Sequence, residues 1–212
     1  AIVGASGAVG QEFLNILERR PLPIDELLLF GSERSAGRKY TFRGKEIEVR
    51  LLQHNDDFRG VDFALVSAGA GTSREFAETI TRHGAVMIDN SSAFRMDADV
   101  PLVVPEVNPR DIEWHSGVIA NPNCSTIQMV AALQPLHELA PITRVVVSTY
   151  QAASGGGAKA MAELYDQTRD FLGGTPDDEL SVEAFQHRIA FNCIPHIDVS
   201  LDDGSTKEEW KM

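Results

Sequence analysis

The chain has 212 residues, 43% of them hydrophobic, and a formal net charge of −12 at pH 7. No run of about 18 apolar residues could cross a membrane, and a strongly negative protein is repelled by nucleic acid, so we expect neither partner. Two cysteines do not suggest a disulfide scaffold. The composition therefore favours a soluble protein of a reducing compartment, and we expect it in the cytoplasm.

The chain starts with an apolar triplet, residues 1–3, that predicts a strand and is followed by GASGAVG. Gly4, Gly7 and Gly10 are spaced three apart, and apolar residues at helical spacing follow them. Glycines between a strand and a helix are typical of a dinucleotide-binding βαβ unit, although a plain glycine-rich turn is the alternative. The residues expected to bind the cofactor here are Gly4, Ser6, Gly7, Ala8, Val9 and Gly10.

The segment after the next predicted strand, residues 27–30, bears on which dinucleotide binds. NAD sites usually place an acidic residue at the end of this strand to bind the ribose hydroxyls. Here Ser32, Arg34 and Ser35 suit a 2′-phosphate, because hydroxyls and a guanidinium donate hydrogen bonds to its oxygens. Glu33 argues for NAD, but we expect NADP to be preferred.

Strands and helices continue to alternate in the middle of the chain. The patterns predict strands over residues 61–67 and 85–89, with a helix over 72–82 between them. Residues 40–50 are expected to form a small hairpin that turns at Arg43-Gly44 and lies over the sheet.

A cysteine in the segment NPNCSTIQ is the candidate nucleophile. Apolar residues 117–120 predict a short buried strand, and the apolar spacing after Cys124 predicts a helix that starts at this residue. The unpaired N–H groups and the helix dipole there favour the thiolate, which is the species that attacks carbonyls and acyl phosphates. The alternative is a buried structural cysteine, but the strand-to-helix context favours the nucleophile.

The last third of the chain is less regular. Residues 143–150 are expected to form a strand, and the segment AASGGG leads into a helix over about residues 158–171. His196 is expected in a strand and Cys193 in the core. The whole pattern predicts an α/β protein: a Rossmann-like, doubly wound parallel sheet in residues 1–121, then an incomplete α+β catalytic and dimerisation domain in 122–212.

Six segments in this order resemble the aspartate-semialdehyde dehydrogenases: GASGAVG, SERSAG, DNSSAFRMD, NPNCSTIQ, YQAASGGG and TKEEWK. The resemblance spans nearly the whole chain. NPNCSTIQ is its specific element, because the related acetylglutamyl-phosphate reductases show an NPGCYPT-like segment and the glyceraldehyde-phosphate dehydrogenases an SNASCTT-like one. The resemblance implies a homodimer that uses NADPH to convert L-aspartyl 4-phosphate into L-aspartate 4-semialdehyde and phosphate, on the route to lysine, methionine and threonine.

The resemblance also implies catalytic roles for particular residues. The thiolate of Cys124 would displace phosphate and leave a thioester, which accepts a hydride from the nicotinamide. Gln151 would orient the substrate, and Asn123 would be a further residue that binds substrate or phosphate. Arg95 would bind the transferred phosphate with its planar fork of donors. The alternatives are a strand-end glutamine and a solvated surface arginine.

Further expected contacts lie in the last third of the chain. Ser154 and Gly155 would contact the nicotinamide side of the cofactor, although their turn could equally be a flexible loop. Glu208 and Lys211 are three residues apart, so on a helix they would share one face. The resemblance assigns Glu208 to the substrate amine and Lys211 to phosphate, and the alternative is an ordinary exposed pair. No metal site is expected.

One family feature is missing, because the general base is a histidine in a segment that would follow Met212. None of the six histidines occurs in the matching motif, so we expect a fragment that is cut at both ends and has little activity alone. Other functions stay open: a dinucleotide-binding redox sensor, a reductase of an N-acetylglutamyl-type acyl phosphate, or a noncatalytic fragment. A sensor has no use for the anion-binding residues, so their convergence on Cys124 would favour acyl chemistry.

Overall fold

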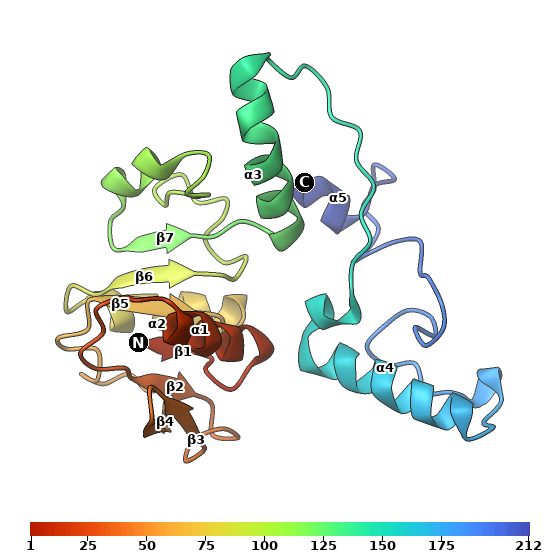
Figure 1. The fold of residues 1–212 in the computed structure, drawn as a ribbon, viewed down its shortest axis with the longest axis horizontal. Helices are drawn as coiled ribbons and strands as arrows, with labels where there is room; N and C mark the ends of the chain where they lie inside the picture. Colours follow the sequence, from red (N-terminus) through yellow and green to blue (C-terminus); the bar gives the residue numbers. More distant parts are fainter. The chain divides into compact units, whose positions relative to one another are not determined.

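The computed structural model describes all residues 1–212 and divides into two compact units, residues 1–143 and 144–212. Unit 1 holds a seven-stranded sheet with helices α1, α2 and α3, and unit 2 holds α4 and α5 (Figure 1). The functional boundary predicted after residue 121 stays a prediction, and α3 belongs to unit 1 in this division. None of the helices is both long enough and apolar enough to cross a membrane.

The sheet of unit 1 has the strand order β3-β4-β2-β1-β5-β6-β7. Its strands are β1 (Ile2–Val3), β2 (Leu29–Gly31), β3 (Lys39–Phe42), β4 (Lys45–Leu51), β5 (Phe63–Val66), β6 (Val86–Asp89) and β7 (Val118–Ala120). All neighbours are parallel except β3 and β4. The chain builds outward from β1 to one side and then, from β5, to the other. This topology confirms the predicted Rossmann-like, doubly wound sheet.

Helices cover both faces of the sheet. The helices of unit 1 are α1 (Ala8–Arg19), α2 (Ala70–Thr81) and α3 (Cys124–Leu139), with a short 3-10 helix at Pro109–Trp114. Ile2 packs in a core cluster with Leu14 of α1, and its neighbour Val3 packs in a second cluster with Ile80 of α2. Adjacent strand residues point to opposite faces, so α1 and α2 lie on opposite sides of the sheet.

The predicted hairpin forms, but its placement differs from the expectation. Arg43 and Gly44 at its turn have φ values of 47° and 77°, which is the left-handed pattern of a tight hairpin turn. The expectation that the hairpin lies over the sheet is wrong, because β4 pairs in parallel with β2 through Leu29 and Val49. The hairpin therefore extends the sheet, and it supplies a partner for the backbone edge of β2.

Unit 2 is built around α4 (Gly157–Leu172), with a short helix α5 (Lys207–Lys211) and 3-10 turns at Ala153–Gly156 and Asp177–Glu179. The predicted helix over 158–171 is confirmed. The buried Gln167 organises the following loop, since its amide donates to the Ser181 carbonyl at 2.7 Å and accepts from the backbone N–H groups of residues 189 and 190.

Three expectations for unit 2 are wrong. Residues 143–150 form no strand, and Val146 and Tyr150 are 82% and 95% exposed. Their β-branched run suits a strand, but a strand also needs a neighbour to pair its backbone groups, and unit 2 offers none. His196 lies in an irregular segment, with its Nε2 2.6 Å from Gln186 Oε1. Cys193 lies in the same irregular segment and is exposed, so it is not a core residue.

Candidate active site

The carboxyl ends of the parallel strands lie along one edge of the sheet of unit 1 (Figure 1). The glycine turn follows β1 at this edge, and the residues that follow the other strands are Ser32 after β2, Ser67 after β5, Asn90 after β6 and Asn121 after β7. The chain changes direction between β1 and β5, and ligands of such sheets bind at this switch point. The sequence-predicted residues of unit 1 thus gather on the edge where a ligand is expected.

The glycine turn is shaped by two close approaches of the backbone. Gly4 has a φ of 86°, and a Cβ atom on it would lie 2.3 Å from the Ser67 carbonyl oxygen. A Cβ atom on Gly10 would lie 2.2 Å from the Gly4 carbonyl oxygen. Neither position can carry a side chain without moving backbone atoms, so the turn brings β1, α1 and the end of β5 together.

The residues of this turn fit the phosphates of a dinucleotide. Gly7 is the N-cap of α1 and supplies no side-chain cap, and the first turn has no acidic residue. Gly7, Ala8 and Val9 are exposed, so the orphan N–H groups and the positive end of the dipole are accessible to an anion. The buried hydroxyl of Ser6 has no hydrogen-bond partner, and a bound phosphate would supply an acceptor.

The residues after β2 divide into two groups. Ser32 and Arg34 are exposed. Ser35 is buried, and its hydroxyl donates to the Ser32 carbonyl at 3.0 Å, which closes the turn. The hydroxyl of Ser35 is therefore engaged within the protein, whereas Ser32 and Arg34 are available to a ligand.

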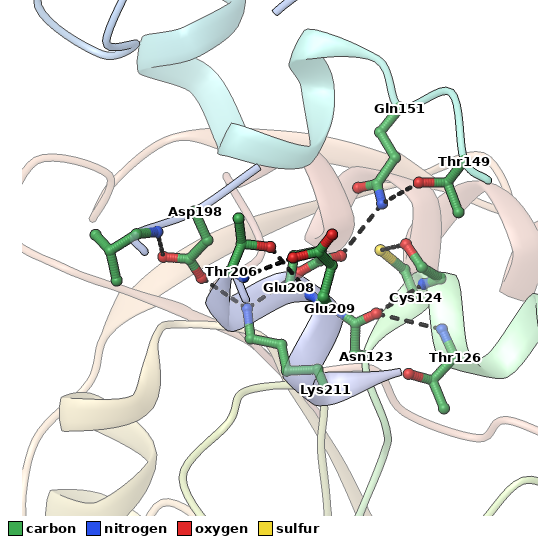
Figure 2. A network of polar contacts seen from close by, with 12 residues as sticks. Asn123, Cys124, Thr126, Thr149, Gln151, Asp198, Thr206, Glu208, Glu209 and Lys211 are labelled. Atoms are coloured by element: carbon green, nitrogen blue, oxygen red, sulfur yellow. Dashed lines mark hydrogen bonds and ion pairs between the residues drawn. The ribbon is translucent and has the colours of Figure 1, made fainter. Parts of the chain in front are cut away.

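The candidate nucleophile lies where the sequence predicts it. Cys124 is the first residue of α3 and is exposed, which contradicts the alternative of a buried structural cysteine. Asn123 caps the helix, since its Oδ1 accepts from the N–H groups of Ser125 at 2.9 Å and Thr126 at 3.2 Å (Figure 2). The sulfur of Cys124 lies 4.0 Å from the Ser125 hydroxyl. This geometry places the thiol at the exposed first turn of a capped helix, at the positive end of the helix dipole.

Arg95 lies beside the segment that leads to Cys124. Its Nε donates to the Asn121 carbonyl at 2.9 Å and its Nη2 to the Asn90 carbonyl at 3.0 Å. These partly buried contacts contradict the alternative of a solvated surface arginine. The guanidinium thereby joins the chain after β6 to the chain after β7.

The loop that carries Arg95 is anchored at both ends. At its start, the fully buried Asp89 accepts from the hydroxyls of Ser73 and Ser91, each at 2.6 Å. At its other end, Arg74 of α2 donates to both oxygens of Asp97, at 2.6 and 2.8 Å. This hydrogen bond is the main cause that lowers the pKa of Asp97 and raises the pKa of Arg74. The loop is thus fixed on the helix that follows β5.

Unit 2 brings three of its predicted site residues together. Gln151 donates from Nε2 to Glu208 Oε1 at 3.3 Å, and Lys211 donates to Glu208 Oε2 at 3.1 Å (Figure 2). Glu208 is only 7% exposed, so the alternative of an ordinary exposed Glu/Lys pair is wrong. The predicted sharing of one helix face by Glu208 and Lys211 is confirmed.

Lys211 also binds Asp198, with its Nζ 2.8 Å from Oδ2 (Figure 2). Burial acts to lower the pKa of Lys211, but the hydrogen bonds to Asp198 and Glu208 outweigh it, so the pKa is raised above its usual value. The hydrogen bond from Lys211 is in turn the main cause that lowers the pKa of Asp198. Lys211 therefore stays cationic at neutral pH, and it is flanked by two acidic side chains.

The turn predicted to contact the nicotinamide is a 3-10 helix, Ala153–Gly156, that precedes α4. Ser154 and Gly155 are both exposed in it. Their roles stay predictions, and the accessible backbone of the turn is compatible with them.

Several polar residues of the two units were not predicted. Asn90 and Asn121 each follow a predicted strand, and that position at the carboxyl edge is the signal that identifies them. Gly69, the N-cap of α2 with a φ of 90° and no side-chain cap, follows β5 in the same way. Asp198 has no such signal, because it lies in an irregular segment with a φ of 68°.

Comparison with known protein families gives two matches along the chain. Residues 1–115 match the NAD-binding domain of semialdehyde dehydrogenase, and residues 133–212 match the semialdehyde dehydrogenase dimerisation domain. The aspartate-semialdehyde dehydrogenase of Aquifex aeolicus is 56% identical over 214 residues, and that of Bacillus subtilis is 50% identical over 219 residues. Both alignments cover 100% of this chain and 62% of the relative. The chain thus spans about three fifths of the length of these relatives.

Solved structures give the same picture. Aspartate semialdehyde dehydrogenase II from Vibrio cholerae, complexed with ASA, aligns with a TM-score of 0.94 at 47% identity, over 100% of this chain and 62% of its own. The aspartate semialdehyde dehydrogenase with NADP from Candida albicans aligns with a TM-score of 0.58 at 29% identity, over 67% of this chain and 47% of its own. The fold of both domains therefore has close relatives among solved structures.

Proposed function

The chain belongs to the semialdehyde dehydrogenase family, and from this premise we propose that its full-length natural form is an aspartate-semialdehyde dehydrogenase. The proposed reaction is the reductive dephosphorylation of L-aspartyl 4-phosphate to L-aspartate 4-semialdehyde and phosphate. The observation that carries the proposal is the exposed Cys124 at the capped start of α3, on the sheet edge that also bears the glycine turn. The names of the relatives supply the substrate class.

Cys124 is the proposed nucleophile. Its thiolate attacks the acyl carbon of the substrate, so that a C–S bond forms. The C–O bond to the phosphate breaks, and phosphate leaves with the bonding electron pair. The product on the protein is a thioester at Cys124. Once the acyl carbon is reduced to the aldehyde, the sulfur leaves as thiolate and the residue returns to its starting state.

The charged residues suit the groups of an amino-acid acyl phosphate. Glu208 is proposed for the substrate ammonium, since a carboxylate accepts its hydrogen bonds. Lys211 and Arg95 are proposed for phosphate, because both are cationic donors. Gln151 is proposed to orient the substrate, and its bond to Glu208 supports this by fixing the amide beside the proposed ammonium site.

The cofactor is proposed to be NADP. When bound, the nicotinamide supplies the hydride. The glycine turn of residues 4–10 would hold the pyrophosphate against the start of α1, and the exposed Ser32 and Arg34 would bind a 2′-phosphate. Ser154 and Gly155 would face the nicotinamide side through their backbone.

The assembly and location follow from the same proposal. Residues 133–212 match a dimerisation domain, which supports a homodimer of the full-length form. A catalytic thiol needs a reducing compartment, which supports the cytoplasm.

The test is phosphate-dependent reduction of NADP by the full-length natural form, with L-aspartate 4-semialdehyde and N-acetyl-L-glutamate 5-semialdehyde compared side by side. The proposal predicts turnover with the aspartate aldehyde and none with the other. Turnover with the acetylglutamate aldehyde alone would instead indicate a reductase of an N-acetylglutamyl-type acyl phosphate. No turnover with either aldehyde would favour the redox sensor.

A further inference from the structure

Asn121 is bonded to one segment of the chain through its backbone N–H, its carbonyl and its side chain. Its backbone N–H donates to the Asp89 carbonyl at 2.8 Å, and its own carbonyl accepts from Arg95 Nε at 2.9 Å. Its side-chain Nδ2 donates to Asn90 Oδ1 at 2.7 Å. Both backbone groups and the side chain of Asn121 are thus bound to residues 89–95, which comprise the last residue of β6 and the loop that follows it.

This loop is itself fixed to the neighbouring strand. The backbone N–H of Asn90 donates to the Val66 carbonyl at 2.8 Å, and its Nδ2 lies 3.4 Å from the Ser67 hydroxyl. Arg95 Nη2 closes the arrangement by donating to the Asn90 carbonyl at 3.0 Å. A continuous set of polar contacts therefore crosses the carboxyl ends of β5, β6 and β7.

The connection from Asn121 to Cys124 has little freedom. Only Pro122 and Asn123 separate the two residues. Pro122 is buried, and its ring fixes its φ angle, while Asn123 is committed to capping α3. A displacement of Asn121 would thus be passed on to the first turn of α3, where the thiol lies.

We propose that Asn90, Asn121 and Arg95 form a clasp that positions the Cys124 nucleophile. Arg95 then has a positioning role on the protein's own backbone, besides the phosphate-binding role proposed above. The inference rests on the proposed function only in taking Cys124 as the nucleophile. Its chemical basis is the dipole of α3, whose positive end attracts negative charge on the sulfur only while the sulfur keeps its place at the first turn.

The test measures the rate at which iodoacetamide alkylates Cys124 at pH 7 in the Asn121→Leu and Arg95→Lys variants. The rate is read from the peptide that carries Cys124, since Cys193 is also exposed and would react. We expect the rate to fall roughly two- to fivefold, the range that corresponds to the usual effect of a helix N-terminus on a charge. Arg95→Lys keeps the charge but cannot reproduce a fork that binds two carbonyls.

Two controls separate positioning from general loosening. Arg82→Gln removes an ion pair with Asp56 at the end of α2, in the same unit, and leaves the contacts of residues 89–97 and Asn121 in place, so its alkylation rate should match that of the unsubstituted chain. NADP affinity, read by fluorescence titration, should stay unchanged in the Asn121 and Arg95 variants, because neither residue belongs to the glycine turn of residues 4–10. If the Asn121→Leu variant misfolds and so loses NADP binding, the alkylation rate of Cys124 in the Arg95→Lys variant tests the proposal instead.

A double variant tests whether the clasp acts as a unit. Asn90→Leu and Asn121→Leu together should slow alkylation no more than the more harmful of the two single substitutions, because both remove the contact between the two amides. Unchanged alkylation in the single variants, or an equal loss in Arg82→Gln, would overturn the proposal. The alkylation rate is measured without turnover. A result against the clasp can therefore be told apart from a result against the proposed enzyme activity.

Discussion

Replacement of glycine by alanine is expected to have opposite effects at Gly10 in α1 and at Gly71 in α2. Alanine is the better helix former, so the substitution usually stabilises a helix. At Gly71 nothing lies within 4 Å of the added Cβ atom. At Gly10 the added atom would lie 2.2 Å from the Gly4 carbonyl oxygen and 2.8 Å from the Ala5 Cα atom. These neighbours are backbone atoms, which cannot move aside as a flexible side chain can.

The magnitudes follow from these contacts. At Gly71 the free energy of unfolding should rise by about 0.4–1 kcal/mol, because the unfolded chain loses conformational freedom. At Gly10 the same gain is opposed by overpacking, which typically costs about 1–3 kcal/mol, so a net loss of roughly 1–2 kcal/mol is expected. The two variants should therefore shift the urea midpoint of unit 1 in opposite directions.

The assay is urea unfolding followed by the fluorescence of Trp114, which lies in unit 1. A Trp210→Phe background removes the second tryptophan, which lies in unit 2. If Gly10→Ala raises the midpoint as Gly71→Ala does, the close approach of α1 to the glycine turn is refuted as the reason for the glycine.

In unit 2, Gln167→Leu should lower the free energy of unfolding by roughly 2–3 kcal/mol, because it removes the hydrogen bonds of a buried amide to three backbone groups of the following loop, of which the N–H of Ala190 is buried. The matched change Gln134→Leu, at a partly exposed side chain with an exposed hydrogen bond to Glu138, should stay within about 0.5 kcal/mol, and equal losses in thermal unfolding would contradict this. Since Lys211 lowers the pKa of Asp198, their pair stabilises the fold above the ordinary aspartate value of 3.8 and loses its effect as the pH falls through the folded-state value. In the Asp198→Asn variant the free energy of unfolding should therefore fall less steeply as the pH drops below about 4. The same steepness as in the unsubstituted chain would argue against a stabilising pair. Cys124→Ala should abolish turnover of the full-length form while NADP affinity is kept, and a loss of NADP binding would count against a purely covalent role.

The features that could be predicted from sequence are those with a local signal. The start of α3 at Cys124 follows from the apolar spacing of residues 127–133, and the hairpin turn follows from Arg43-Gly44. The carboxyl-edge placement of the glycine turn follows from its position between a strand and a helix.

The features that could not be predicted depend on contacts distant in sequence. Residues 143–150 carry the side chains of a strand, yet strand formation depends on a pairing partner and unit 2 supplies none. The contact between Asn90 and Asn121 joins residues 31 positions apart, and it exists because β6 and β7 are neighbours in the sheet. Asp198 reaches Lys211 through an irregular segment, for which no periodicity exists.

The most direct test of the central claim is to trap the acyl group on the nucleophile. The full-length natural form is incubated with L-aspartate 4-semialdehyde and NADP in the absence of phosphate, and the peptides that carry Cys124 and Cys193 are compared by mass spectrometry. The account predicts an aspartyl adduct on the Cys124 peptide alone, removable by hydroxylamine as a thioester should be. An adduct on Cys193, or reduction of NADP with no adduct on Cys124 in rapidly quenched samples, would contradict it.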